Sequence, residues 1–298
     1  MLKENEFSLL FTGGLDSTYR LCQLAQQKNV TVQPIYIVNP IRKHTQLEIK
    51  AQDKILEYIK THPHTQAQIL PLKYISIKDI INYKYFREVM AIKQNGRYPW
   101  RRLFAIYALQ DYGVELCCES YKNVFLTENI VHFKTIKNHR FIDFYKMNEK
   151  DLCIFLGLPK INKDLINAFS KIAWPILGVT RQQMQKDIAE WGYEEIWQKI
   201  WFCSMPISDS NCGLCLDCQL KLRQGLDFLF SNEAKKRYLV FNIIKNNYPV
   251  AMLDMYKNYI RRKNFKVNGF KEKYWLKQIQ EFENKNIIEL KDILNGKE

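Results

Sequence analysis

A short stretch near the start of the chain carries residue types that can hold a phosphate. An apolar run ends there in a turn rich in glycine and hydroxyl side chains: Thr12, Gly13, Gly14, Leu15, Asp16, Ser17 and Thr18. Glycines accept positive φ and let backbone N–H groups surround an anion. The helix expected after the turn adds free N–H groups and the positive end of its dipole. The stretch therefore predicts a site for the phosphates of a nucleotide.

The turn differs from the nucleotide loop that ends in Gly-Lys-Ser/Thr. No lysine follows Gly14, and the four-residue spacer between glycines is absent. Without a lysine to reach the β and γ phosphates, the turn is better suited to holding a departing pyrophosphate, as in adenylation. Asp16 can contribute by binding Mg²⁺, by orienting the loop, or by capping the helix. A Gly-Gly turn without function is the alternative interpretation.

Four cysteines have the spacing of a metal site. They are separated by eight, two and two residues and are Cys203, Cys212, Cys215 and Cys218. Gly213 supplies a tight turn between two of them, and four thiolates suit a tetrahedral Zn²⁺. Such a site is closed, so the metal would hold the fold and not touch substrate. An iron–sulfur cluster also accepts four cysteines and remains an alternative.

Two residues at the start of a predicted helix are candidates for ligand contact. Arg42 can meet a phosphate or a carboxylate. His44 shares a helix face with Glu48, one turn later. A solvated first turn is the alternative interpretation for all three residues.

Two further arginines fall at predicted helix starts. Arg101 lies in the first turn of a helix predicted over residues 100–112. A cation there opposes the helix dipole, which indicates an anion nearby. Arg181 follows Thr180, which is the predicted N-cap of a helix over residues 180–192.

The elements that must position these residues alternate between strand and helix. Strands are predicted over residues 7–11, 30–38, 69–75 and 114–118, and helices over 19–28, 42–60, 79–93, 100–112 and 180–192. Strand–helix–strand units imply parallel pairing with right-handed crossovers. The glycine turn then lies at the carboxyl edge of the first strand, where open α/β sheets bind ligands. The predicted fold class is α/β, with a doubly wound, mainly parallel sheet of about five strands.

The chain beyond the cysteines is helical in pattern. Helices are predicted over residues 220–230, 233–246, 250–263 and 271–283. Basic and aromatic residues alternate there, which favours a surface for nucleic acid or protein. An aromatic core stripe with lysines on the wet face is the alternative. The expected regions are a nucleotide-binding α/β domain over 1–192, a four-Cys zinc region over 193–230 and a helical basic extension over 231–298.

Composition limits the class of protein. The chain has 298 residues, a formal net charge of +14 and eight cysteines. The charge favours acidic partners such as ATP or nucleic acid. No apolar run is long enough to span a membrane, and the start lacks the pattern of a secretion signal, so we expect a cytoplasmic protein. Cysteines in a cytosolic chain indicate metal binding or buried thiols before disulfides.

These motifs together resemble those of a known enzyme family. The segment Thr12–Ser17 resembles the Ser-Gly-Gly-x-Asp-Ser loop of the PP-loop ATP pyrophosphatases. Among these, the chain is similar to the 7-cyano-7-deazaguanine synthases, loosely from Phe7 to Leu226. The similarity is carried by the loop, the four cysteines and these further segments: Arg42–His44 with Glu48, Pro99–Leu103, Pro175–Arg181 and Trp201–Cys203. The chain departs from the family pattern on the substrate side, at Asn39–Ile41 and Trp100–Arg102.

The resemblance implies an activity and a set of ligands. It implies the PP-loop fold of the adenine nucleotide alpha hydrolases and an ATP-dependent C–N ligase that uses ATP, Mg²⁺ and Zn²⁺. In that family the carboxylate of 7-carboxy-7-deazaguanine, a queuosine precursor, is adenylated, attacked by ammonia and converted to a nitrile. The implied catalytic residues are Asp16, Arg42, His44, Arg101 and Arg181.

Two alternatives and the partners remain open. Divergent relatives in antiviral defence conjugate the activated base to an amine of a partner protein. A zinc-containing nucleic-acid-binding protein without catalysis is the second alternative. A protein or nucleic-acid partner on the basic C-terminal region and a homodimer are further expectations.

Overall fold

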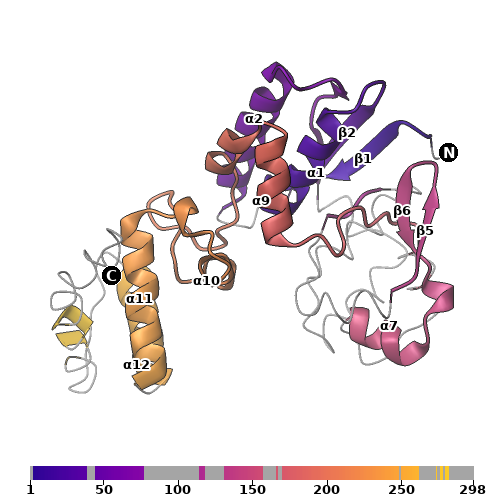
Figure 1. Cartoon of the computed structure of the whole chain (residues 1–298). Coiled ribbons are helices and arrows are strands. Elements are labelled where there is room, and N and C mark those ends of the chain that lie inside the picture. Colours follow the sequence, from indigo (N-terminus) through magenta and orange to yellow (C-terminus); the bar gives the residue numbers. More distant parts are fainter. Residues whose placement is uncertain are drawn as a thin grey trace. The chain divides into compact units, whose positions relative to one another are not determined.

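The structure is a computed structural model that describes residues 3–38, 44–76, 114–117, 131–156, 166, 170–247, 250–261, 273, 276–277 and 279–281. The described chain separates into two compact units, residues 1–201 and residues 202–298. Figure 1 shows the strands in the first unit and helices α10, α11 and α12 in the second. The division into three regions at residues 192 and 230 stays a prediction.

Four parallel strands form the described sheet of the first unit. The strands and the helices that follow them are β1 (Glu6–Leu10), α1 (Leu15–Ala25), β2 (Thr31–Val38), α2 (Thr45–Thr61), β3 (Gln68–Ile69) and β4 (Lys73–Ser76). β2 pairs in parallel with β1 on one side and with β3 and β4 on the other. The predicted α/β class with a parallel sheet is confirmed.

Isolated bridges extend pairing beyond β1. Glu115 pairs in parallel with Leu9 and with Ala173, and Ala173 pairs antiparallel with Phe141. Phe141 belongs to β6 (His139–Ile142), which forms a hairpin with β5 (Phe133–Ile136). β1 thus has β2 on one side and the Glu115 segment on the other. Such a position, where successive strands lie on opposite sides of the first, is where parallel sheets bind ligands.

Several predicted element bounds are corrected. α1 begins at Leu15 and not at residue 19, because its N-cap Gly14 leaves the turn with extended backbone. The single strand predicted over 69–75 is two short strands, β3 and β4, separated at Pro71, which has no N–H to donate. At the predicted strand 114–118, the described residues 114–117 show only the bridge at Glu115. The helices predicted over 79–93 and 100–112 lie outside the described residues.

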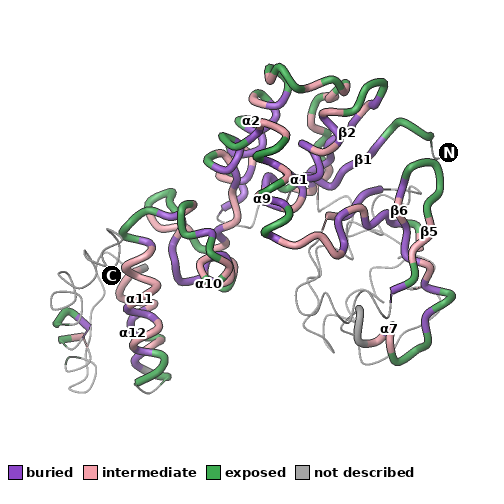
Figure 2. The backbone as a smooth tube through the Cα atoms, viewed as in Figure 1, coloured by how far each residue is buried: buried purple, intermediate pink, exposed green. Residues whose placement is uncertain are grey.

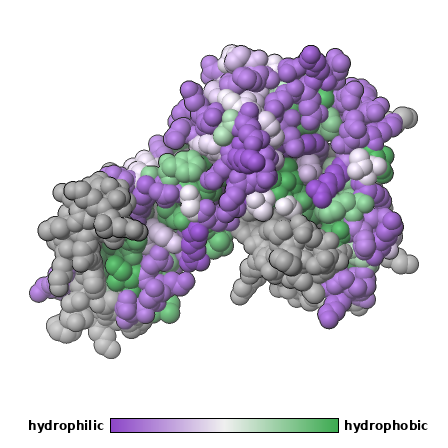
Figure 3. All heavy atoms as spheres, viewed as in Figure 1, coloured by the Kyte–Doolittle hydropathy of each residue, from purple (hydrophilic) through white to green (hydrophobic). Residues whose placement is uncertain are grey.

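The remaining helices of the first unit are α7 (Glu149–Leu156) and α9 (Arg181–Glu190), with short 3-10 turns at Phe144–Lys146 and Glu194–Gln198. Buried residues concentrate along β1, β2 and α1, and the visible side of α9 is hydrophilic (Figures 2 and 3). This is the pattern of amphipathic helices over an apolar sheet.

The second unit is helical. Its elements are α10 (Leu216–Arg223), a 3-10 turn at Asp227–Leu229, α11 (Asn232–Asn247) and α12 (Val250–Arg261). The helix predicted over 233–246 is confirmed, and the one predicted over 250–263 is confirmed as far as the described residues reach, to Arg261. In contrast, α10 ends before Gly225, whose φ of +74° breaks the helix predicted over 220–230. Most of 271–283 lies outside the described residues. Within the described part of the chain, no helix has the length and apolarity to cross a membrane.

A buried ion pair joins α1 to the Glu115 segment. Arg20 donates two hydrogen bonds to Glu115, from Nε at 2.8 Å and from Nη2 at 2.6 Å, and the Glu115 side chain is fully buried. Burial alone would lower the pKa of Arg20, but the charge and hydrogen bonds of Glu115 raise it above its ordinary value. The pair ties α1, the helix that follows the glycine turn, to the Glu115 segment that pairs with β1.

We expect Glu115→Gln to lower the free energy of unfolding by about 3 kcal/mol or more, because it leaves the Arg20 charge buried without a counter-charge. Chemical denaturation measures this loss. Glu190→Gln is the matched control, since Glu190 pairs with Lys186 on the surface and such pairs contribute about 1 kcal/mol or less. Equal losses in the two variants would contradict a special role for the buried pair.

Candidate functional site

The glycine turn directs backbone N–H groups into its own interior. The N–H of Thr12 donates to Ser17 Oγ at 3.3 Å, and the N–H of Gly14 donates to Thr12 Oγ1 at 3.4 Å. Both distances exceed the usual 2.9–3.0 Å, so these bonds are weak. Phosphate oxygens can therefore replace the hydroxyl groups as acceptors, while the hydroxyls turn to donate to the same anion.

Neighbouring elements hold the turn in place. Gly13 has φ of +69°, and its carbonyl oxygen accepts a hydrogen bond of 2.8 Å from the N–H of Trp201. From α2, Gln52 Nε2 donates to the carbonyl of Phe11 at 3.2 Å, and its Cγ lies 3.1 Å from where a Cβ on Gly13 would be. Glycine is thus favoured by its positive φ and also by space, since a Cβ here would need the Gln52 side chain to shift by a few tenths of an ångström. The sequence prediction missed Gln52, since nothing local marks it.

The structure brings Asp16 and Arg181 together. Arg181 Nη1 donates to Asp16 Oδ1 at 2.5 Å, and the Arg181 side chain is buried. Asp16 is not the helix cap, since Gly14 occupies the N-cap position of α1. The ion pair offsets the negative charge of Asp16 beside the turn, which favours the approach of an anion.

Helix α9, which carries Arg181, is fixed on both sides of that residue. Thr180 is the N-cap and accepts a hydrogen bond of 3.1 Å from the N–H of Gln183, which confirms the predicted cap. Farther along, Asp187 accepts a hydrogen bond of 2.6 Å from the hydroxyl of Tyr19 on α1. Burial and this contact raise the pKa of Tyr19. Arg181 is thereby held in a defined place beside the turn.

A second group of polar side chains lies next to the turn. The hydroxyl of Tyr36 on β2 donates to Glu48 Oε2, and His44 Nε2 lies 3.5 Å from Glu48 Oε1. All three side chains are buried. The predicted proximity of His44 and Glu48 is confirmed, and a solvated first turn is wrong for these two residues. Arg42 and Arg101 lie outside the described residues.

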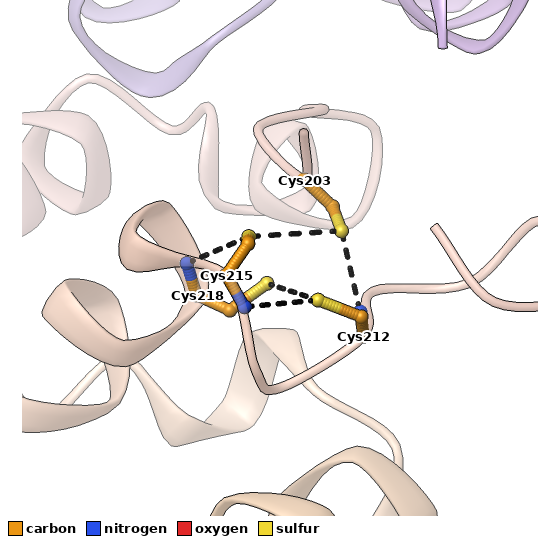
Figure 4. Close-up of side chains that lie close together, drawn as sticks. All are labelled: Cys203, Cys212, Cys215 and Cys218. Carbon is orange, nitrogen blue, oxygen red and sulfur yellow. Dashed lines mark hydrogen bonds between the residues drawn. The ribbon is translucent and has the colours of Figure 1, made fainter. Parts of the chain in front are cut away.

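The second unit brings the four cysteines together. Figure 4 shows their sulfur atoms converging from the segment at Cys203, the turn at Cys212 and the start of α10. The four Sγ atoms all lie within 4.8 Å of one another and are buried. The distance is 4.0 Å from Cys203 Sγ to Cys215 Sγ and 3.8 Å from Cys212 Sγ to Cys218 Sγ. A disulfide would need about 2.0 Å, so these are separate thiols, and their arrangement could hold a metal ion.

Backbone N–H groups stabilise negative charge on the sulfurs. Cys212 Sγ accepts hydrogen bonds of 3.2 Å from the N–H groups of Leu214 and Cys215, and Cys203 Sγ accepts one of 3.3 Å from the N–H of Cys212. Hydrogen bonds among the four thiols lower the pKa of Cys212 and Cys215 and raise the pKa of Cys203 and Cys218. A thiolate is the form that binds metal.

The cysteine turn is built into the start of α11. Arg237 Nε donates to the carbonyl of Cys212 at 2.8 Å, and Nη2 donates to the carbonyl of Asn211 at 3.2 Å. A Cβ on Gly213 would lie 2.2 Å from the carbonyl oxygen of Ala234. In turn, the hydroxyl of Tyr256 on α12 donates to the carbonyl of Arg237 at 3.3 Å. The helices of the second unit are therefore assembled on the cysteine turn.

The chain has distant likenesses among solved structures. The chain is similar in structure to the U34-tRNA thiolase NcsA from Methanococcus maripaludis with its 4Fe-4S cluster. The two are 14% identical, the match covers 90% of this chain and 77% of that chain, and the TM-score is 0.35. The sequence matches no family model and no curated protein. A likeness of this size assigns no function.

We expect Gly213→Ala to disrupt the second unit, because its Cβ would overlap the backbone of α11. Gly225→Ala is the matched control: its φ of +74° is nearly the same as the +75° of Gly213, and no atom of the described structure lies within 4 Å of its Cβ position. The control should cost about 1–2 kcal/mol of backbone strain alone. The melting temperature and the amount of bound metal should both fall further in Gly213→Ala than in Gly225→Ala. Equal effects would contradict the packing argument.

Metal removal should unfold the second unit, because its helices are assembled on the cysteine turn and the ion would hold the four buried thiols of that turn together. We expect about one metal ion per chain, with a folding contribution on the order of 10 kcal/mol by analogy with small zinc sites. Elemental analysis and melting of Cys215→Ser test this, with Cys153→Ser on α7 as the control outside the cluster. Unchanged metal content and melting in Cys215→Ser would refute the site.

Proposed function

We propose that the chain is an ATP-dependent, AMP-forming enzyme of the PP-loop type, with the turn Thr12–Ser17 holding the β and γ phosphates as departing pyrophosphate. The observation that carries this proposal is the turn itself: inward N–H groups, hydroxyls and a helix N-terminus gathered at the carboxyl end of β1. The parallel β1–β2 pair and the strand arrangement around β1 support the doubly wound PP-loop fold.

A catalytic role explains more of the site than a binding module does. A zinc-containing nucleic-acid-binding protein needs no phosphate turn with a paired Asp16 and Arg181, and no buried carboxylate beside it. Burying charged side chains is unfavourable unless they are paired with an opposite charge or bind a ligand. The enzyme is therefore the favoured function, and nucleic acid or a partner protein on the basic C-terminal region is a proposal for the partner only.

The residues divide the work of adenylation. Backbone N–H groups of the turn with Thr12, Ser17 and Thr18 would bind the pyrophosphate, and Arg181 would stabilise charge on the phosphates or the acceptor carboxylate. Mg²⁺ commonly binds through substrate phosphates and one or two carboxylates. Asp16, already paired with Arg181, is the carboxylate of the turn that fits this role. Arg42 and Arg101 remain proposed contacts.

We propose a 7-deazaguanine carboxylate as the acceptor, on the strength of the family resemblance. Its oxygen attacks the α phosphorus, the bond to the β phosphate breaks and pyrophosphate leaves. Ammonia then attacks the acyl carbon, AMP leaves and an amide forms. The amide oxygen then attacks the α phosphorus of a second ATP and pyrophosphate leaves. AMP departs with that oxygen, and loss of the two N–H protons gives the nitrile. In the alternative conjugation reaction, the amine belongs to a partner protein.

We propose Zn²⁺ as the metal of the four cysteines. With Zn–S bonds of about 2.3 Å, a tetrahedral ion places its sulfurs about 3.8 Å apart, close to the 3.8 and 4.0 Å of the two cysteine pairs. In a 4Fe-4S cluster each cysteine binds a different iron, which holds the sulfurs further apart than one shared ion does. Metal analysis and the absorption spectrum distinguish zinc from iron.

Pyrophosphate release from ATP tests the proposed function. We expect Asp16→Ala to abolish it, because the variant loses the proposed Mg²⁺ ligand. Arg181→Met should reduce it by about 100-fold or more, because it removes a positive charge that stabilises the transition state. Gln183→Ala is a control on the same helix turn as Arg181. Release of γ-phosphate without pyrophosphate would contradict the proposal.

A further inference from the structure

A buried polar group beside the phosphate turn takes no part in the proposed phosphate binding. It consists of Tyr36, Glu48 and His44, which are 2%, 8% and 5% exposed. The Tyr36 hydroxyl donates a hydrogen bond to Glu48 Oε2, while His44 Nε2 lies 3.5 Å from Glu48 Oε1. Each partner thus engages a different oxygen of the same carboxylate.

The group lies at the edge of the sheet where a nucleotide would bind. β1 and β2 are parallel neighbours, with Leu10 opposite Ile35, so their carboxyl ends lie side by side. The backbone oxygen of Glu48 lies 3.5 Å from the Cβ position of Gly13. The turn of α2 that carries Glu48 therefore packs directly on the phosphate turn. His44 is one helical turn nearer the start of α2, toward the carboxyl edge.

The His44 side chain is not explained as a helix cap. His44 is the N-cap residue of α2, but its side chain makes no capping hydrogen bond to the described residues of that helix. It faces Glu48 instead. A carboxylate that orients an imidazole, and is itself held by a third group, is the arrangement that activates nucleophiles in many enzymes.

We propose that His44 accepts the proton of the attacking amine, and that Glu48 and Tyr36 are positioning residues that hold its imidazole. This inference rests on the proposed function. The amine nitrogen bonds to the acyl carbon, and the carbon–oxygen bond to AMP breaks with its electron pair on AMP. One N–H proton passes to the His44 imidazole. The Glu48 carboxylate then stabilises the imidazolium, an interaction strengthened by the low exposure of the group.

The inference predicts that the two half-reactions respond differently. Adenylation needs no proton acceptor, whereas amine attack does. In Glu48→Gln and Tyr36→Phe, the rate of pyrophosphate exchange into ATP should stay within about twofold of that of the unmodified chain. Amide formation from the adenylate should slow by about 10- to 100-fold, within the range of general-base effects. The KM for ATP should not change. His44→Ala should lose amide formation most, and added imidazole should restore part of it.

The experiment uses the full chain with ATP, Mg²⁺, 7-carboxy-7-deazaguanine and ammonia. Tyr74→Phe is the matched control, since Tyr74 lies opposite Tyr36 on β4 and is 48% exposed; it should behave as the unmodified chain in both half-reactions. Melting curves check that Tyr36→Phe, which keeps the ring, is folded.

The outcomes separate the two proposals. If the unmodified chain exchanges pyrophosphate, and Tyr36→Phe and Glu48→Gln form amide at its rate, the inference is overturned and the proposed function stands. Loss of both half-reactions together in a folded variant also overturns it, since the role is then structural. If the unmodified chain exchanges no pyrophosphate with this acid, the proposed function fails, and the inference fails with it.

Discussion

The backbone conformation of Gly13 is the constraint on which the nucleotide site depends. Its positive φ turns the chain from the end of β1 into α1, and its carbonyl is held by the N–H of Trp201. Its missing side chain lets α2 approach through Gln52 and Glu48. Gly13 thus influences both the direction of α1 and the distance between α2 and the phosphate turn. The lack of a side chain at this position favours the close packing of α2, which carries Glu48, on the phosphate turn.

In the second unit, a glycine again allows close packing, here between the cysteine turn and a helix. Gly213 lets the cysteine turn contact the start of α11, and Arg237 returns from α11 to bind the carbonyls of the turn. A metal ion on the four thiolates would therefore stabilise the helices as well as the turn itself. The four cysteines lie in the first seventeen residues of this unit, 202–218, so a metal bound there would hold the segment from which the helices extend.

Features encoded in short stretches were predictable from the sequence. The phosphate turn, the parallel β1–α1–β2 unit, the Thr180 cap and the four cysteines all depend on residues close together in the chain. The long-range partners were not predictable in the same way. Glu115 meets Arg20 and Asp16 meets Arg181 across large sequence separations, and Gln52 looks like any polar residue of a helix. The start of α1 was predicted too late because its N-cap residue is Gly14, which has no side chain to mark the start of a helix.

The central claim is that the turn at residues 12–17 is a pyrophosphate site, and calorimetric titration of inorganic pyrophosphate with Mg²⁺ tests it most directly. The unmodified chain should bind pyrophosphate. Gly13→Ala should bind it at least about tenfold more weakly, because φ of +69° strains an alanine and its Cβ would meet Gln52. A melting curve would verify that the variant is folded. Equal binding by the two chains, or no binding by either, would contradict the account.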